Sequence, residues 1–550
     1  MADKSTFTDF YTGLHHGYAR VVSMTGRGPV LVVLPENGTA FEAWRSNRED
    51  AAPCGPLWTP EWMTHSKAYQ EFDWRGAAGA QWNMPTSVLL PPLANVTFGF
   101  RLLLAPNVSS IDTAIESVGK AAVHAVPGYV ISTEMTSAKL LITLPSHGQS
   151  RISAMVVKPA GAIELGETSI ARRGTRGGRM VVVPVYGKHY GRAKVSIHYR
   201  HGNASSVQTV HYFILPPFRA HVAKFGNFQA STAWFDMSEG MDPFGRTSSV
   251  MPWDREEGKH VLDDPRPYVV GLSDEAGAGA NVGLAMKVCY APDQVQVSCV
   301  DQYIQETLCG NKTGEIPFPV SLQEPVSGGI RASLFWVPTP GSQEPGMPGY
   351  DYNPIDFAGR IWNYTRAVQS LGRAYNYPHQ TAVYWSMYHA AENNDLLQTA
   401  QPALWYLKKA VFTIQGMMSR APYYAQFGLM VGSVFREVLL ELEREGLTDE
   451  AATVRGMMQK RAEHGMDLGP YTGACPDPPG VCACNQTTNG TYLLSCKGWV
   501  DNRFPFGSEF AWDSTGQEEI YVWGRYFGLA NVSETALDAV LAFMPGAIPN

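Results

Sequence analysis

The sequence predicts a multidomain β plus α protein, with an N-terminal β-sandwich followed by a domain of αα-hairpins. The chain has 550 residues, more than one hydrophobic core normally holds. Short apolar runs separated by Gly, Pro and Asn fill the first part, whereas apolar residues recur at helical spacing in the last part. A segment dense in Pro and Gly, residues 337–354, separates the two patterns and is interpreted as a linker.

Residues 1–217 are expected to form the β-sandwich. The apolar runs at 30–34 and 180–185 should be central strands, and the alternating run at 194–199 should have one face in water. Residues 111–118 are predicted to form a short helix. The other predicted strands cover residues 96–104, 139–144, 152–157 and 207–215.

Residues 218–336 are predicted to be a loop-rich continuation of the β region that lines a cleft. A long loop inside a domain is usually functional or disordered, and the aromatic content here is atypical of disorder. The glycine-rich segment 277–283 lacks the spacing of a phosphate loop and is interpreted as a turn. The candidate substrate-binding residues of this region are Trp234, Asp236, Asp242, Arg246, Asp254 and Arg255.

Residues 355–550 are predicted to be helical, and short connections between the helices favour antiparallel αα-hairpins. An insertion at 470–500 contains Cys475, Cys482, Cys484 and Cys496, where two disulfides would stabilise a loop with no core of its own. The expected helices cover residues 355–375, 379–394, 401–418, 426–445, 448–465, 516–528 and 533–544.

The stretch 504–528 holds the residues predicted to be catalytic, Glu509 and Asp513. Both precede the predicted helix at 516–528, and Trp512 and Tyr521 lie close to them in the sequence. A sugar-cleaving site needs two carboxyl groups of different pKa beside aromatic faces on which a pyranose ring stacks. The alternative is that these acids only stabilise the helix N-terminus.

That alternative is preferred for Glu518 and Glu519. Thr515 and Glu518 have the spacing of a capping box, which places the helix start near Gly516. Gly528 fits the position just after the helix end.

Tyr377 and His379 form a second candidate site at the junction of two predicted helices. A His that removes a proton and a Tyr that protonates a leaving oxygen carry out lyase chemistry. A helix junction with packed rings and a capping His is the preferred interpretation.

Composition excludes several classes of function. A net charge of −7 argues against nucleic acid or an anionic membrane as partner, and no apolar run is long enough to cross a bilayer. Neither the cysteines of the insertion nor the cluster of Cys289, Cys299 and Cys309 has zinc-ligand spacing. No nucleotide, serine-hydrolase or zinc-protease motif occurs, so no metal or cofactor is expected. Aromatic residues make up 11% of the chain, which suits the binding of an oligo- or polysaccharide, although large β-cores also use them. The protein is expected to be a monomer.

The number of N-glycosylation sequons exceeds what chance gives. Their excess predicts a secreted, extracellular glycoprotein. No signal peptide is visible at the start of the sequence, so the natural N-terminus is expected to lie upstream. The nine sequon asparagines are Asn37, Asn95, Asn107, Asn203, Asn311, Asn363, Asn485, Asn489 and Asn531.

Three phrases carry a resemblance to a known family: DPFGRTSSVMPWDRE at 242–256, VVGLSDEAGAGA at 269–280 and FGSEFAWDSTGQEEIYVWGRYFG at 506–528. They resemble secreted proteins of the domain of unknown function 5695. The order of β-sandwich, linker and αα-hairpins is similar to that of six-hairpin (α/α) toroid glycosidases and phosphorylases. The resemblance implies a carbohydrate-active architecture. Fewer helices are readable than six hairpins require, so the toroid is expected to be incomplete.

Three functions follow as hypotheses. The first is an inverting glycoside hydrolase with Glu509 or Asp513 as general acid and a partner among Asp236, Asp242 and Asp254. The second is a polysaccharide lyase that uses Tyr377 and His379. The third is a non-catalytic glycan-binding protein.

Protein from a secreting eukaryotic host should carry glycans on several of the nine sequons and oxidised cysteines between Cys475 and Cys496. Intact mass before and after deglycosylation, together with a thiol count in denaturant, measures both. Eight free thiols and an unglycosylated mass would contradict the secreted assignment.

Overall fold

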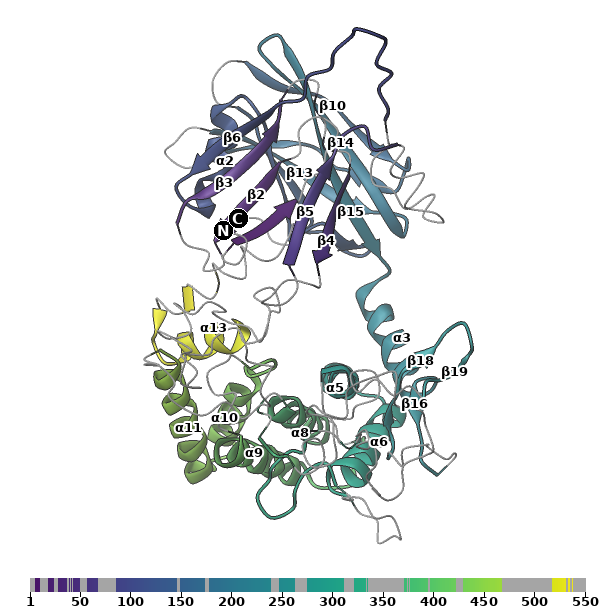
Figure 1. Ribbon diagram of the computed structural model, residues 1–550. Helices are drawn as coiled ribbons and strands as arrows, with labels where there is room; N and C mark the ends of the chain where they lie inside the picture. The colour runs from purple at the N-terminus through teal and green to yellow at the C-terminus, as the bar shows by residue number, and fades with distance from the viewer. Residues whose placement is uncertain are drawn as a thin grey trace. The chain divides into compact units, whose positions relative to one another are not determined.

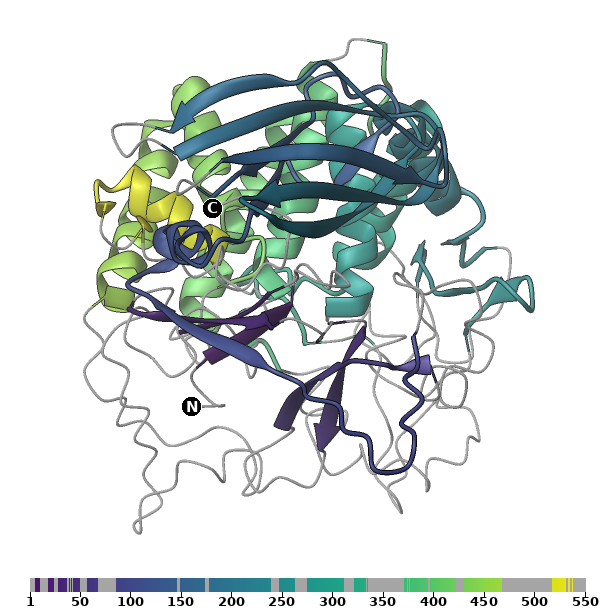
Figure 2. The same cartoon turned by 90° about the horizontal axis from the view of Figure 1, so that it is seen from above.

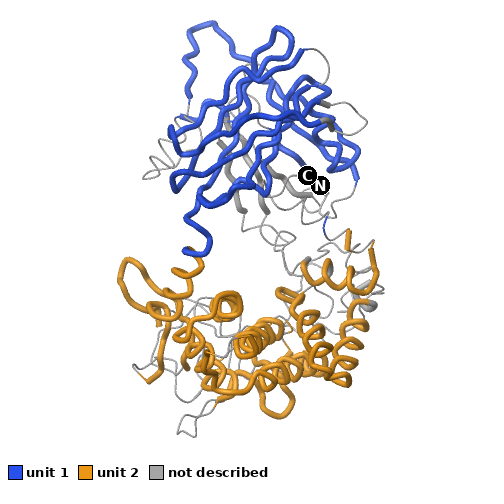
Figure 3. Tube along the Cα trace, turned by 180° about the vertical axis from the view of Figure 1, so that it is seen from behind, with its two compact units in different colours: residues 1–220, 537–550 blue, residues 221–536 orange. Residues whose placement is uncertain are grey.

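Strands dominate the first part of the chain and helices the second, as the hydrophobic patterns predicted. The computed structural model divides into unit 1, residues 1–220 with 537–550, and unit 2, residues 221–536 (Figures 1 and 3). The structure describes residues 5–9, 18–23, 28–36, 39, 41, 43–49, 57–67, 86–145, 149–173, 178–238, 247–262, 275–310, 321–332, 334, 370–372, 374, 376–393, 396–421, 429–466, 517–530, 533, 534 and 537.

The described strands of unit 1 form three larger sheets. The first has the order β1-β2-β3-β6, the second β10-β14-β15-β8, and the third β11-β13-β9-β7, with β12 also paired to β13. All neighbours are antiparallel except β8 and β15, and Figure 2 shows long strands of unit 1 side by side. The strands are β1 (Ser5–Asp9), β2 (Ala19–Ser23), β3 (Val30–Pro35), β6 (Phe100–Ala105), β7 (Ala122–Val126), β8 (Val130–Ser132), β9 (Lys139–Thr143), β10 (Ser150–Lys158), β11 (Ile163–Leu165), β12 (Ser169–Arg173), β13 (Gly178–Gly187), β14 (Gly191–His201) and β15 (Ala204–Leu215), with a separate hairpin of β4 (Ala43–Glu49) and β5 (Leu57–Met63).

One hydrophobic core joins the sheets of unit 1, because the buried faces of β3, β9, β13, β14 and β15 all contribute to it. β3 and β13 are interior strands, as their apolar sequences predicted. In β14, buried residues alternate with more exposed ones, so the predicted wet face is confirmed. The predicted short helix is α2 (Ile111–Ser117), tied to β7 by a buried 2.8 Å contact between Asp112 and His124.

Unit 2 is mainly helical, and its small strands form two short hairpins. The helices predicted near 379, 401, 448 and 516 are present within a few residues of their expected bounds, and the one expected at 426 begins later. Its elements are α3 (Phe218–Ala230), β16 (Trp234–Phe235), β17 (Ser249–Val250), β18 (Trp253–Asp254), β19 (Lys259–His260), α5 (Glu275–Tyr290), α6 (Gln294–Gln302), the π-helical segment η3 (Tyr303–Leu308), α8 (Asn376–Glu392), α9 (Ala403–Arg420), α10 (Val434–Arg444), α11 (Thr448–Met466) and α13 (Gln517–Tyr526).

The expectation of a loop-rich β region up to residue 336 is wrong at residues 218–230 and 275–308, where α3, α5, α6 and η3 lie. The described residues between α3 and α5 are turns and the short strands β16–β19, as expected. The predicted glycine turn at 277–283 is also wrong, because these residues belong to α5. One of these glycines, Gly283, serves helix packing. A Cβ at Gly283 would lie 3.1 Å from the Phe225 ring of α3, and a Cβ at Gly226 of α3 would lie 2.8 Å from Lys287 Cδ of α5, so each glycine makes room for a side chain of the other helix.

Helix α8 is buried on nearly every side, as its aromatic sequence predicted. It packs against α5, α6, α9 and α10, and Figure 1 shows it among the green and teal helices of unit 2. Gly528 ends α13 with a φ of 72°, and the Leu529 N–H reaches the Gly524 carbonyl over 2.7 Å. The predicted glycine stop of this helix is therefore confirmed.

Replacing Gly416 with alanine should destabilise unit 2 by about 1–3 kcal/mol, because the added Cβ on α9 would collide with the carbonyl group of Gly328. Gly456→Ala is the matched control. Gly456 is an exposed glycine within α11 with no atom within 4 Å of an added Cβ, so its substitution should stabilise by about 0.5–1 kcal/mol. Urea unfolding followed by circular dichroism measures both, and a neutral or stabilising Gly416→Ala would contradict the close approach.

Candidate functional site

A network of polar side chains lies where the β16–β17 hairpin meets the end of α6. β16 pairs with β17, so Asp236, which follows β16, lies near Ser248, which precedes β17. The Met237 N–H donates to Ser248 Oγ over 3.1 Å. Gln302 donates through Nε2 to Asp236 Oδ2 over 3.1 Å and lies 3.2 Å from Ser248 Oγ. The hairpin pairing therefore brings Asp236, a sequence-predicted site residue, onto the end of α6.

Glu306 supplies a second carboxylate to this network. Ser248 Oγ donates to Glu306 Oε2 over 2.6 Å. Glu306 lies in η3, where the Cys309 N–H reaches the Ile304 carbonyl, five residues back, over 2.8 Å. Such π-helical segments are rare and occur frequently at functional sites.

The carboxylates of Asp236 and Glu306 are close together. The same Gln302 Nε2 lies 3.1 Å from Asp236 Oδ2 and 3.4 Å from Glu306 Oε1, so these two oxygens are no farther apart than the sum of those distances. Both side chains are half-buried. A pair of carboxylates from separate elements, oriented by shared donors, can divide the roles of acid and base or of acid and nucleophile.

Aromatic rings lie on the β16–β17 hairpin and on the β18–β19 hairpin that follows it in the chain. Phe235 and Trp253 each meet the His260 ring edge-on, with centroid distances of 6.1 and 5.0 Å. Burial lowers the pKa of His260, and the imidazole is therefore uncharged near neutral pH. Trp234 is half-buried and begins β16, and Asp236 directly follows the end of that strand.

Asp254 shapes a turn. Its Oδ1 accepts the backbone N–H groups of Glu256 and Glu257 over 2.8 and 2.9 Å, and these bonds lower the pKa of Asp254. The carboxylate closes the β18–β19 hairpin, and its neighbour Arg255 is exposed.

Tyr377 and His379 lie in the first turn of α8 and are both buried. The Tyr377 hydroxyl donates to the Leu371 carbonyl over 2.7 Å, and burial raises the pKa of Tyr377 above its usual value. This placement is that of residues packed in the core of unit 2.

Glu519 does more than favour the helix dipole. It is in the first turn of α13, as predicted, but its buried carboxylate pairs with Arg461 of α11 over 2.7 Å and accepts the Leu429 N–H over 2.6 Å. The preferred role as a capping residue is corrected to that of an ion pair between helices. Tyr521, on the same helix, is half-buried and contacts Arg525 through its ring and hydroxyl.

A family comparison identifies the chain. The model of the family of unknown function DUF5695 matches residues 1–472 and 494–550. The chain belongs to this family. Searches of curated proteins and of solved structures gave no match. The phrases that carry the resemblance lie within the matched residues of this DUF5695 protein.

Several predictions lie outside the described residues of the DUF5695 protein: Glu509, Trp512, Asp513, Asp242, Arg246, the linker at 337–354 and the cysteines of the 470–500 insertion. Among the described cysteines, Cys289, Cys299 and Cys309 are free thiols. Burial raises the pKa of Cys289 and of Cys299 to about 11, which keeps both protonated at neutral pH. Of the described helices, none is long and apolar enough to cross a membrane.

Sequence reasoning missed Ser248, Gln302 and Glu306. Gln302 and Glu306 have the i, i+4 spacing of neighbours on a helix, and this was the signal available. The π-helical geometry and the approach of the β16–β17 hairpin have no sequence pattern that we can identify.

Glu519→Gln should destabilise the protein by about 3–5 kcal/mol, because it leaves the buried Arg461 guanidinium without its compensating charge. Glu437→Gln is the control, since Glu437 pairs with Arg436 at the surface, where an ion pair contributes at most about 1 kcal/mol. Chemical denaturation measures both variants. Equal effects would show that the Arg461–Glu519 pair does not stabilise unit 2 as described.

Proposed function

We propose that this DUF5695 protein is a secreted glycoside hydrolase and that Asp236 and Glu306 form its catalytic carboxylate pair. The observation that supports the proposal is the shared contact of both carboxylates with one amide nitrogen, that of Gln302. Glycosidases that use two carboxylates require this kind of close, oriented pair. The exposed sequon residues Asn95, Asn107 and Asn203 agree with secretion.

The short separation favours a retaining mechanism for this pair over the inverting one expected from the sequence. Retaining enzymes have carboxyl groups roughly 5–5.5 Å apart, whereas inverting enzymes need about 6.5–9.5 Å to admit a water molecule. The distances through Gln302 place an upper bound on the separation of Asp236 Oδ2 and Glu306 Oε1, and this bound falls at the lower limit of the inverting range.

The hydrogen bonds to Asp236 favour this residue as the nucleophile and leave Glu306 as the acid. Asp236 Oδ1 accepts the N–H and the hydroxyl of Ser238 over 2.8 and 2.6 Å, and Oδ2 accepts from Gln302. Donors of this kind favour a charged carboxylate, which a nucleophile must be. Asp236 would attack the anomeric carbon, and Glu306 would protonate the leaving oxygen and then activate water. The half-buried Trp234 would offer its ring to the sugar.

Unit 2 is also where the proposed toroid would lie, because α8, α9, α10 and α11 pack against one another, and a short connection joins α10 to α11. Glu509 and Asp513 remain candidates for the acid from the sequence. Tyr377 and His379 remain the candidates for a lyase, although their burial in α8 favours a structural role.

Glu306→Gln and Asp236→Asn should each lower turnover about 10²–10⁴-fold and leave substrate binding largely unchanged, because each keeps the hydrogen-bonding shape but removes an acid or nucleophile. Products from a panel of oligo- and polysaccharides are followed by mass, by absorbance of unsaturated uronates and by NMR of the anomeric proton. The control is Glu324→Gln, a unit 2 carboxylate that accepts the Val326 and Ser327 N–H groups in a turn.

Full activity of Glu306→Gln and of Asp236→Asn, with loss of activity in Glu509→Gln or Asp513→Asn, would show that the catalytic residues lie in the 504–528 stretch instead. Unsaturated products lost on His379→Ala would support the lyase instead. Binding without any product would leave glycan binding as the function. Net inversion of the anomeric centre would reject the retaining assignment.

A further inference from the structure

A polar groove of about 830 Å³ lies within unit 1. It is formed by the segment after β3, by β6, by the end of α2 and by the β14–β15 hairpin. Its size is in the range of pockets that hold small organic ligands. Its lining residues are Leu34, Pro35, Glu36, Thr39, Arg101, Ser117, Val118, Gly119, Lys120, His201, Ala204, Ser205 and Ser206.

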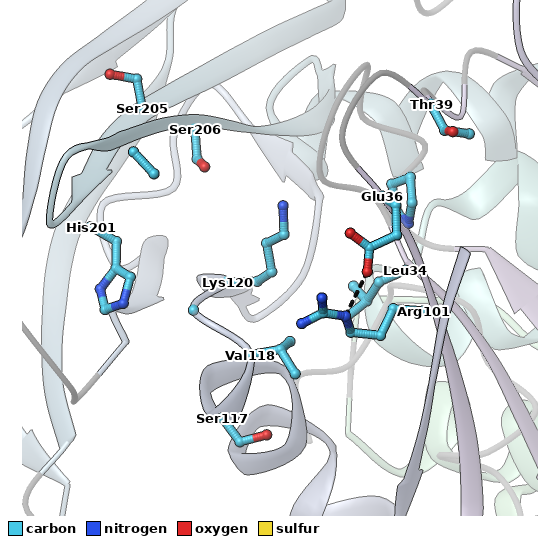
Figure 4. Close-up of a pocket in the computed structure, with 13 residues that line it drawn as sticks. Leu34, Glu36, Thr39, Arg101, Ser117, Val118, Lys120, His201, Ser205 and Ser206 are labelled. Carbon is cyan, nitrogen blue, oxygen red and sulfur yellow. Dashed lines mark hydrogen bonds and ion pairs between the residues drawn. The ribbon is translucent and has the colours of Figure 1, made fainter. Parts of the chain in front are cut away.

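The end of α2 directs Lys120 into this groove. Gly119 follows the helix with a φ of 78°, a conformation that favours glycine, and its N–H reaches the Glu116 carbonyl over 3.0 Å. A Cβ at Gly119 would lie 3.2 Å from the His201 ring, so the turn packs closely against the hairpin. Figure 4 shows Lys120 between His201 on one side and the Arg101–Glu36 pair on the other.

Basic groups outnumber acidic ones in the lining. Arg101 Nε pairs with Glu36 Oε1 over 2.6 Å, and both side chains are partly exposed. Lys120 adds a second basic side chain, whereas Glu36 is the one carboxylate among the lining residues. Burial lowers the pKa of Lys120, Glu36 raises it and Arg101 lowers it. Because burial disfavours the charged ammonium group, a bound anion would stabilise that charged form.

The remaining polar lining consists of the His201 imidazole and hydroxyl groups. Ser206 turns its hydroxyl toward Lys120, whereas the Ser205 oxygen points away from it (Figure 4) and the Ser117 hydroxyl donates to the Ala114 carbonyl over 2.7 Å. Apart from the His201 imidazole, none of the lining residues is aromatic. The groove therefore lacks the stacking face that neutral sugars use, and recognition here would depend on charge and hydrogen bonds.

We propose that this groove is a second saccharide-binding site, specific for an acidic sugar that carries a carboxylate or a sulfate group. Lys120 and Arg101 would bind the anionic group, and the serine hydroxyls would bind hydroxyls of the sugar ring. The choice of a saccharide rests on the proposed function, whereas the choice of an anion rests on the groove alone.

Calorimetry on the full chain tests the proposal with oligogalacturonates as the carboxylate probe, heparin-derived oligosaccharides as the sulfate probe, and neutral cello-oligosaccharides and inorganic sulfate as comparisons. We expect at least one acidic probe to bind more tightly than either comparison, with an affinity that falls as salt rises. Whichever acidic probe binds identifies the anionic group.

Lys120→Met should weaken binding of that probe about tenfold or more, since a charge-assisted contact is lost. Lys120→Arg, which restores the charge, should recover most of it. Lys188→Met is the matched control: it removes the same charge from unit 1 at a lysine paired with Glu164 over 2.7 Å and outside the groove lining, so affinity should change less than about twofold.

Equal affinity for neutral and acidic probes, tighter binding of sulfate alone, or no binding of any probe would overturn the proposal. So would unchanged affinity in a folded Lys120→Met protein or an equal loss in Lys188→Met. Because the readout is affinity and the groove is in unit 1, the Glu306→Gln protein should bind the probe normally. A protein without hydrolase activity can therefore be distinguished from a protein whose groove does not bind the acidic probe.

Discussion

Burial of the polar side chains of α8 is the constraint on which the structure of unit 2 depends. A buried polar group is costly unless it is hydrogen-bonded, so each polar residue of this helix limits where its neighbours lie. Gln380 accepts from the Tyr303 hydroxyl over 3.0 Å, and the Tyr384 hydroxyl donates to Gln323 over 2.8 Å. These bonds attach separate segments of the chain to one helix.

The same bonds bear on the candidate site. Tyr303 is the first residue of η3, the segment that contains Glu306. Its fully buried ring and its bond to Gln380 hold this segment against α8. Glu306 is then within reach of the β16–β17 hairpin. Ser248, beside this hairpin, donates to Glu306, and Gln302 of α6 donates to Asp236. The carboxylate pair thus depends on packing behind it as well as on its own hydrogen bonds.

The two proposed sites use different chemistry. In unit 2, two carboxylates accept hydrogen bonds from shared donors, an arrangement suited to bond cleavage in a sugar. In unit 1, Lys120 and Arg101 line a groove that also contains serine residues, an arrangement suited to holding an acidic group. A substrate that contains both neutral and acidic sugars would suit the two sites together. Each site is tested by a measurement that leaves the other site unaffected.

The sequence by itself determined strands β3, β6, β9, β10, β13, β14 and β15 of unit 1, most of the described helices after residue 376, the burial of α8 and the glycine end of α13. These features depend on periodicity and on local backbone conformation, which neighbouring residues specify. The sequence also made Asp236 a candidate site residue, through the aromatic and acidic residues around it. Only the tertiary structure decided that residues 275–290 and 294–308 are helical, because the glycines of α5 resemble those of a turn and Gly283 is needed only where α5 contacts Phe225 of α3. It likewise paired Glu519 with Arg461 and brought Glu306 to Asp236, because these partners are 58 and 70 residues apart in the chain and meet only when the helices pack.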